Sequence, residues 1–244
     1  MTRTLWLPFG SHPDAEMRLL CLPHAGAGAS VYRAWGRELP PSVTVCPVQP
    51  PGRERRQDEL PFTSVEPLVK VLAQEIITSV RSPYAILGHS TGSLCAFEVI
   101  RELRALGGPM PEHLFVAGRP APQVPVKVHN LADLSLEELA RLLRDLGGTP
   151  EEILADDGLL RRMQPLLAAD FWVNERYTYR PGQPLHVPIT AFAGHDDVVA
   201  EPPQLAAWRE QTTVDFTMRT LDGGHFAIFD HAPEVHACIA SSLR

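Results

Sequence analysis

A serine between two glycines is the part of this sequence best suited to covalent chemistry. The pentapeptide Gly88-His89-Ser90-Thr91-Gly92 has the pattern Gly-x-Ser-x-Gly, which on its own also occurs by chance. Here it follows the apolar run 84–87 and opens a helical pattern that ends at Gly107. This strand–turn–helix setting predicts a nucleophile elbow, a strained turn that presents the Ser90 hydroxyl for attack. The competing interpretation is a turn serine that caps the helix.

A serine hydroxyl is a weak nucleophile, so it needs a base to take its proton and a carboxylate to orient that base. The stretch Asp222-Gly-Gly-His225-Phe226 follows the last strand-like run, and its two glycines free the backbone to aim an imidazole. We therefore predict His225 as the base, against the alternative of a loop histidine bonded to backbone. His89, the neighbour of the serine, is expected to point away from the acyl site.

Two adjacent aspartates compete for the role of the acid. Asp196 and Asp197 both follow the strand-like run 188–193. In the α/β-hydrolase fold, where elbows of this kind are found, the acid commonly lies three residues after the glycine that ends this strand, and counting from Gly194 selects Asp197. Counting back from Val199 as a hydrophobic anchor selects Asp196 instead. We predict Asp197 and keep Asp196 as the alternative, since only one can face the imidazole.

The tetrahedral intermediate of acyl transfer needs two N–H donors for its oxyanion. Thr91 follows the nucleophile and supplies one backbone N–H by its position in the elbow. The glycine-rich loop 23–29 follows the first core strand, and we predict the backbone N–H of Ala25 as the second donor. Phosphate binding is disfavoured for this loop, because it lacks the Lys-Ser/Thr of a P-loop and the spacing of a dinucleotide fingerprint.

The elements that must position these residues alternate between short apolar runs and helical patterns, which is typical of a parallel sheet with crossover helices. Thr63 to Glu66 fits a capping box that opens one such helix. From about 120 to 187 the chain is mostly helical, most clearly over 134–146 and 151–167, which predicts a lid inserted between two strands. We expect one α/β domain, 1–244, with a mostly parallel sheet and helices on both faces. The predicted strands are 17–22, 43–48, 84–87, 113–117, 188–193 and 214–221.

Composition narrows the class of protein. The 244 residues carry a net charge of −7, which disfavours nonspecific binding to nucleic acid or to an anionic membrane. The sequence contains no apolar stretch long enough for a membrane helix and no run at its start that is typical of a signal peptide. The four cysteines are far apart, so buried free thiols and a cytoplasmic protein are expected. Since no pairing element is evident, we expect a monomer.

Several motifs together resemble the external type II thioesterases of polyketide and nonribosomal peptide biosynthesis. They are the elbow, Leu22-Pro-His-Ala-Gly26, Val48-Gln-Pro-Pro-Gly-Arg-Glu-Arg-Arg56, Leu146-Gly-Gly-Thr-Pro-Glu-Glu-Ile-Leu154, Pro165-Leu-Leu-Ala-Ala-Asp170 and Gly224-His225. The resemblance therefore runs over nearly the whole chain. It implies the triad Ser90, Asp197 and His225, with Ala25 and Thr91 at the oxyanion hole. This sequence departs from the family where Ala168 replaces an arginine and Val198 replaces a proline.

The resemblance implies an editing thioesterase, which removes stalled or wrong acyl groups from the phosphopantetheine arm of an acyl or peptidyl carrier protein. No cofactor or metal of its own is implied. Arg53, Arg55 and Arg56 are candidates for docking an acidic carrier, with a solvated charged loop as the alternative. The rival functions are a fatty acyl carrier thioesterase of fatty acid synthesis, a lipase or carboxylesterase, an acyltransferase, and a scaffold without catalytic activity. The lid leucines are expected to line an acyl chamber or to pack the lid on the sheet.

Overall fold

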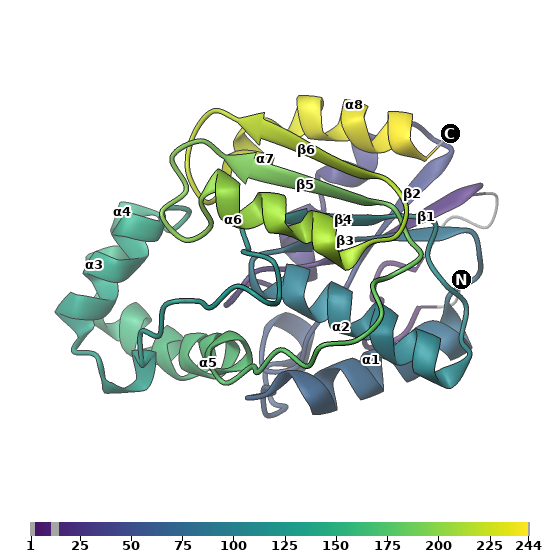
Figure 1. The fold of residues 1–244 in the computed structure, drawn as a ribbon. Coiled ribbons are helices and arrows are strands. Elements are labelled where there is room, and N and C mark those ends of the chain that lie inside the picture. The colour runs from purple at the N-terminus through teal and green to yellow at the C-terminus, as the bar shows by residue number, and fades with distance from the viewer. Residues whose placement is uncertain (1–2, 11–14, 244) are drawn as a thin grey trace.

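A six-stranded sheet lies at the centre of the computed structural model, which describes residues 3–10 and 15–243 (Figure 1). The strands follow the order β2-β1-β3-β4-β5-β6, and every neighbouring pair is parallel. This confirms the predicted α/β class and its parallel sheet. The strands are β1 Met17–Leu22, β2 Val43–Pro47, β3 Tyr84–His89, β4 Leu114–Ala117, β5 Ile189–Gly194 and β6 Phe216–Leu221.

Helices cover both faces of the sheet, as Figure 1 shows. The helices α1 (Val65–Ser79) and α2 (Thr91–Leu106) pack on one face, while α7 (Ala227–Asp230) and α8 (Ala232–Ser242) pack on the other. Successive side chains of a strand point to opposite faces, so β1 contributes Leu20 to the first core and Leu19 to the second. Such burial on both faces explains the continuous apolar runs of the strands.

The start of α1 and the presence of α6 (Pro202–Ala206) differ from the sequence-based expectation. The predicted capping box at Thr63 is wrong, because α1 begins one residue later, with Ser64 at the N-cap and no side-chain hydrogen bond there. Glu66 therefore stands one position too early to close the box. A capping box does open α3 (Leu136–Leu146), where Ser135 and Glu138 bond each other's backbone. The short helix α6, on the same face as α2, was not predicted.

The segment between β4 and β5 forms a helical layer beside the sheet, on the left of Figure 1. It contains α3, α4 (Glu151–Leu154) and α5 (Asp157–Glu175). The expected single helical segment 151–167 is instead two helices, because the Asp156 side chain accepts hydrogen bonds from the backbone of Gly158 and Leu159 and starts α5 there. These helices share a small core of their own. Near its end α5 returns to the main body, where Val173 joins the sheet core.

Candidate active site

The loops that carry the predicted site residues meet at the carboxyl edge of the sheet. Loop 23–29 follows β1, Ser90 follows β3, Asp197 follows β5 and His225 follows β6. Because the strands are parallel, their carboxyl ends lie at the same edge, and residues far apart in the sequence come together there. Ala25, Ser90, Thr91 and His225 line one cavity of about 680 Å³. A volume of this order is typical of a small-molecule site.

Ser90 occupies a strained turn. Its φ of 55° and ψ of −121° lie in a region that L-residues avoid, which costs on the order of 1–3 kcal/mol. The flanking glycines leave room for this turn: a Cβ on Gly88 would meet the backbone of Gly92, and a Cβ on Gly92 would meet the carbonyl oxygen of Leu22. The serine also precedes the first turn of α2, where the helix N-terminus favours negative charge. The structure therefore has the elbow geometry that the pentapeptide predicts.

Asp197, and not Asp196, lies against His225. The carboxylate oxygens of Asp197 are 3.0 and 3.2 Å from His225 Nδ1, and both side chains are buried. The Asp196 side chain is 73% exposed and lies 3.9 Å from the His195 ring. A carboxylate at Nδ1 holds the proton on that nitrogen and leaves Nε2 free to accept one. The His225 ring therefore has the tautomer that a general base needs.

The remaining parts of the predicted site are also in place around the cavity. Within residues 3–10 and 15–243, no protein acceptor bonds the backbone N–H of Ala25 or of Thr91, so both are free for an oxyanion. In the same described residues, no hydrogen bond joins the Ser90 hydroxyl to the His225 ring, although both line the cavity. Such contacts often tighten only when substrate binds.

A buried ion pair holds the glycine-rich loop against α5. Asp170 of α5 accepts hydrogen bonds from both terminal nitrogens of Arg53, at 2.6 and 2.8 Å, and from the backbone N–H of Gly26 at 2.7 Å. The side chains of Asp170 and Arg53 are only 11% and 6% exposed. The bidentate contact with Arg53 holds the Asp170 carboxylate, and that carboxylate fixes Gly26, the residue next to Ala25. Sequence reasoning missed this role of Asp170, because the residue lies 144 positions from Gly26 and no local pattern links the two.

Two of the three arginines that were candidates for docking are buried, which fits neither docking nor the alternative of a solvated loop. Arg53 is buried in the ion pair with Asp170, and Arg56 bonds Glu59 at 2.6 and 2.8 Å while stacking 4.6 Å above the ring of Trp6. Neither guanidinium is therefore available to a partner. Arg55 alone of the three is exposed.

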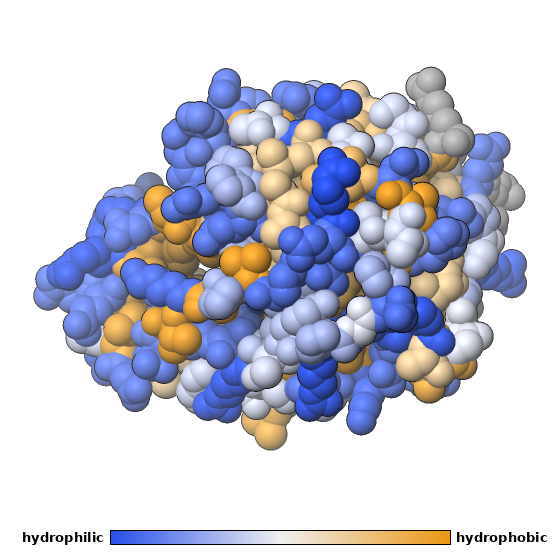
Figure 2. Space-filling model, in the orientation of Figure 1, coloured by the Kyte–Doolittle hydropathy of each residue, from blue (hydrophilic) through white to orange (hydrophobic). Residues whose placement is uncertain are grey.

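The helical layer supplies the apolar wall of the cavity. Figure 2 shows apolar side chains over α3 to α5, around the hollow beside them. The expectation that lid leucines line the cavity holds for Leu142, Leu146 and Leu167. Leu139 and Leu160 pack in the core of the layer itself, where the alternative expected packing on the sheet. Asn174 of α5 also donates a 2.7 Å hydrogen bond to the Thr91 hydroxyl. The apolar wall consists of Val126, Leu142, Leu143, Leu146, Ile153, Met163, Leu167 and Phe171.

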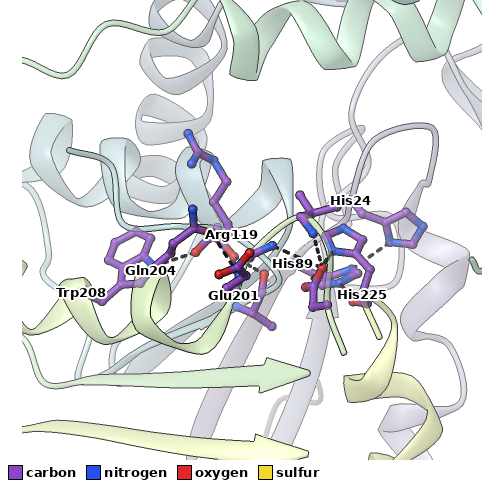
Figure 3. Close-up of polar contacts among 12 residues, drawn as sticks. His24, His89, Arg119, Glu201, Gln204, Trp208 and His225 are labelled. Atoms are coloured by element: carbon purple, nitrogen blue, oxygen red, sulfur yellow. Dashed lines mark hydrogen bonds and ion pairs between the residues drawn. The ribbon is translucent and has the colours of Figure 1, made fainter. Parts of the chain in front are cut away.

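Two further histidines lie near His225. His24 lines the cavity beside Ala25, and His89 is fully buried (Figure 3). Burial lowers the pKa of His24 to about 3 and holds the pKa of His89 well below its ordinary value, with the nearby His225 as a second cause for both. Both rings are therefore neutral at physiological pH. A role for His24 was not predicted, since nothing in the local pattern distinguishes it.

Over the described residues, the chain has neither a membrane-spanning helix nor a cluster of side chains suited to a metal ion. No helix over residues 3–10 and 15–243 is long and apolar enough to cross a membrane. Across those residues, no three His, Cys, Asp or Glu side chains gather in a way that could hold a metal ion. The thiols of Cys21, Cys46 and Cys95 are free and buried, as expected, and that of Cys238 is half-buried.

Known proteins share both the sequence and the fold. A family model described as a thioesterase domain matches residues 17–243. The gramicidin S biosynthesis protein GrsT of Aneurinibacillus migulanus is 40% identical over 94% of this chain and 90% of its own length. The thioesterase PikA5 of Streptomyces venezuelae is 39% identical over 98% of this chain and 85% of its own length. The structure of the type II thioesterase BorB from the borrelidin biosynthetic cluster is 37% identical, with a TM-score of 0.90 over the whole of both chains.

These matches cover nearly the whole chain, and the strained serine turn and the parallel sheet agree with them. The resemblance to type II thioesterases is therefore confirmed. The chain belongs to the thioesterase family, enzymes that hydrolyse thioesters on an α/β-hydrolase fold.

Proposed function

We propose that this enzyme removes stalled or wrong acyl groups from the phosphopantetheine arm of an acyl or peptidyl carrier protein in polyketide or nonribosomal peptide synthesis. The observation that carries the proposal is the strained Ser90 turn, which shares a cavity with His225 while Asp197 orients that ring. The similarity to GrsT, PikA5 and BorB supports a carrier-bound donor. The carrier protein is the partner that follows from this proposal.

The proposed reaction has two halves. In the first, Ser90 Oγ attacks the thioester carbonyl while His225 Nε2 takes the hydroxyl proton, and the N–H groups of Ala25 and Thr91 bind the oxyanion. The intermediate collapses with cleavage of the carbon–sulfur bond, and His225 returns the proton to the departing thiolate. In the second half, His225 takes a proton from water as the water attacks the acyl-serine. His225 then returns that proton to Ser90 Oγ as the carbon–oxygen bond breaks and the carboxylic acid is released. The chain, the substrate and water supply every group, so the scheme needs no further cofactor.

The cavity wall supports an apolar acyl group. Side chains from α3, α4 and α5 face the cavity opposite the Ser90 turn. A cavity of about 680 Å³ exceeds the needs of an acetyl or propionyl group, so it also leaves space for the pantetheine arm or a longer chain.

The experiment that tests the mechanism is release of acyl groups from a propionyl-loaded carrier protein by the wild type and by Ser90→Ala. We expect the variant to lose release while keeping its circular dichroism spectrum and melting temperature. Full activity in the variant would contradict the role of Ser90.

Substrate class needs a second comparison. We expect hydrolysis of acetyl, propionyl and octanoyl groups on a carrier to exceed hydrolysis of the same groups as free ethyl esters. Equal rates would favour a carboxylesterase instead. A strong preference for the octanoyl carrier would favour the fatty acyl thioesterase.

A further inference from the structure

Three histidines, each at or just after the end of a different strand (β1, β3 or β6), form one row, as Figure 3 shows. His24 belongs to the glycine-rich loop, His89 to the elbow and His225 to the loop after β6. His24 Nδ1 lies 3.2 Å from His89 Nδ1, and His89 Nε2 lies 2.8 Å from the backbone carbonyl oxygen of His225. Contacts across 65 and 136 residues thus join the loops that carry Ala25, Ser90 and His225.

The directions of these hydrogen bonds follow from the acceptor at one end. A carbonyl oxygen only accepts, so His89 Nε2 must carry a proton and donate to His225. The fully buried His89 ring is neutral, so its Nδ1 has a lone pair and can only accept. His24 must then donate from Nδ1, which leaves its own Nε2 unprotonated. Both tautomers are therefore determined by the geometry.

Aromatic side chains surround the row. The His24 ring packs edge-on against Phe226 and Phe229, with centroids 4.9 and 5.9 Å apart, and His89 lies 5.3 Å from Phe229. In such an apolar setting hydrogen bonds are stronger, and successive ones polarise each other. The His89 side chain has one polar contact at each ring nitrogen.

We propose that His24 and His89 are positioning residues, which hold the oxyanion loop, the serine turn and the base loop in one arrangement through a directed chain of hydrogen bonds. The chain bonds the backbone of His225 and leaves its ring to Asp197 and the substrate. It thus sets where the base stands relative to Ser90. This inference rests on the proposed function, since it assigns the row a part in the same reaction.

The tautomers provide a test that does not depend on activity. In protein labelled with ¹⁵N-histidine, long-range ¹H–¹⁵N spectra distinguish a protonated Nδ1 from a protonated Nε2, and the signals are assigned from spectra of His24→Asn and His89→Gln. We expect His24 as the Nδ1–H form and His89 as the Nε2–H form, both unchanged between pH 6 and pH 8. An Nε2–H form of His24, or titration of either ring in this range, would overturn the proposal.

Matched variants test the kinetic role. In His24→Asn the side-chain amide can donate a hydrogen bond from near the position of Nδ1, whereas the similarly shaped side chain in His24→Leu cannot. In the same way, His89→Gln keeps a side-chain donor and His89→Met removes it. We expect His24→Leu and His89→Met to lower kcat on a propionyl carrier about 10- to 100-fold, because small displacements of reacting groups have effects of that order. KM should change less than about twofold, and His24→Asn and His89→Gln should restore most of kcat.

A remote buried histidine provides the control for a purely structural effect. His113 bonds Thr190 at 2.9 Å near the start of β4, far along the strand from the catalytic edge. His113→Gln should lower the melting temperature without lowering kcat. If His89→Met does not fold, the kinetic test is made with His24→Leu, whose position lies at the cavity wall. A kcat within about twofold of wild type in His24→Leu would overturn the proposal.

The outcomes separate this inference from the proposed function. An active Ser90→Ala variant would refute the proposed reaction, whatever the tautomers are. An inactive Ser90→Ala variant together with an Nε2–H form of His24 would refute only the positioning chain.

Discussion

The contact between Asp197 and His225 gives a sharp test of the proposed triad through Asp197→Asn. In the wild type, Asp197 Oδ1 accepts hydrogen bonds from the backbone N–H groups of Val199 and Ala200, at 2.8 and 3.3 Å. The asparagine oxygen should keep these donors, which turns the NH₂ group toward His225 Nδ1. That nitrogen must then accept, so the proton moves to Nε2 and the ring can no longer take the Ser90 proton.

The expected loss is large because the base is held in the wrong tautomer. The same substitution in a serine protease triad lowers kcat about 10⁴-fold, and we expect a similar factor here. This corresponds to about 5.4 kcal/mol of transition-state stabilisation. The side chain changes little in size and keeps its backbone bonds, so the melting temperature should fall by only a few degrees.

The assay is release of propionate from a loaded carrier protein at saturating substrate, followed by mass spectrometry of the carrier. The matched control is Asp196→Asn, whose side chain is 73% exposed, and we expect its kcat within about twofold of wild type. The reasoning is refuted if Asp197→Asn keeps more than roughly a tenth of kcat. It is equally refuted if Asp196→Asn alone is crippled.

Three further predictions concern stability. Gly92→Ala should lower the free energy of unfolding by about 1–3 kcal/mol, since the added Cβ meets the Leu22 carbonyl. Gly36→Ala, which has open space around it, should change this free energy little. Equal effects of the two variants in urea titrations would contradict the steric argument. Asp170→Ala leaves the buried Arg53 without its carboxylate and should cost about 3–5 kcal/mol by the same measurement, and a loss below about 1 kcal/mol would show that the pair is not needed. Burial lowers the pKa of His113 to about 4, whereas the pKa of a histidine in the unfolded chain is about 6.5. Between these two pH values the unfolded state binds the proton and the folded state does not. As the pH drops from 7.5 to 4.5, His113 should therefore lower the free energy of unfolding by about 2–3 kcal/mol. His113→Gln should remove this contribution from the pH dependence of the unfolding free energy. An unchanged pH dependence in the variant would contradict the lowered pKa of His113.

Local sequence was enough to find most of the fold and the centre of the site. The apolar runs, the glycines around Ser90 and the glycine pair before His225 are patterns within a few neighbouring residues. Strand burial and the turn conformation depend mainly on such short-range features, and parallel strands bring their carboxyl ends to one edge. The elbow and the loop of His225 could therefore be placed together from the sequence alone.

Long-range contacts account for what sequence reasoning missed. Asp170 meets Gly26 and Arg53 across 144 and 117 residues, and His24 meets His89 across 65. No periodicity connects positions so far apart. The same limit explains why both alternatives for Arg53, docking and a solvated loop, left it exposed, because a charged residue on a loop is expected to be exposed unless its partner is known.

The choice between Asp196 and Asp197 shows most clearly where local sequence ends and tertiary structure decides. The two residues have the same chemistry and adjacent positions, and counting along the chain from Gly194 favours Asp197 while counting back from Val199 favours Asp196. In the folded chain the backbone N–H of Asp196 bonds the Gly223 carbonyl, and that of Asp197 bonds the Gly194 carbonyl. The turn thus exposes the first carboxylate and buries the second against His225. Residue types indicated a carboxylate at this edge of the sheet; the path of the backbone selected which one reaches the imidazole.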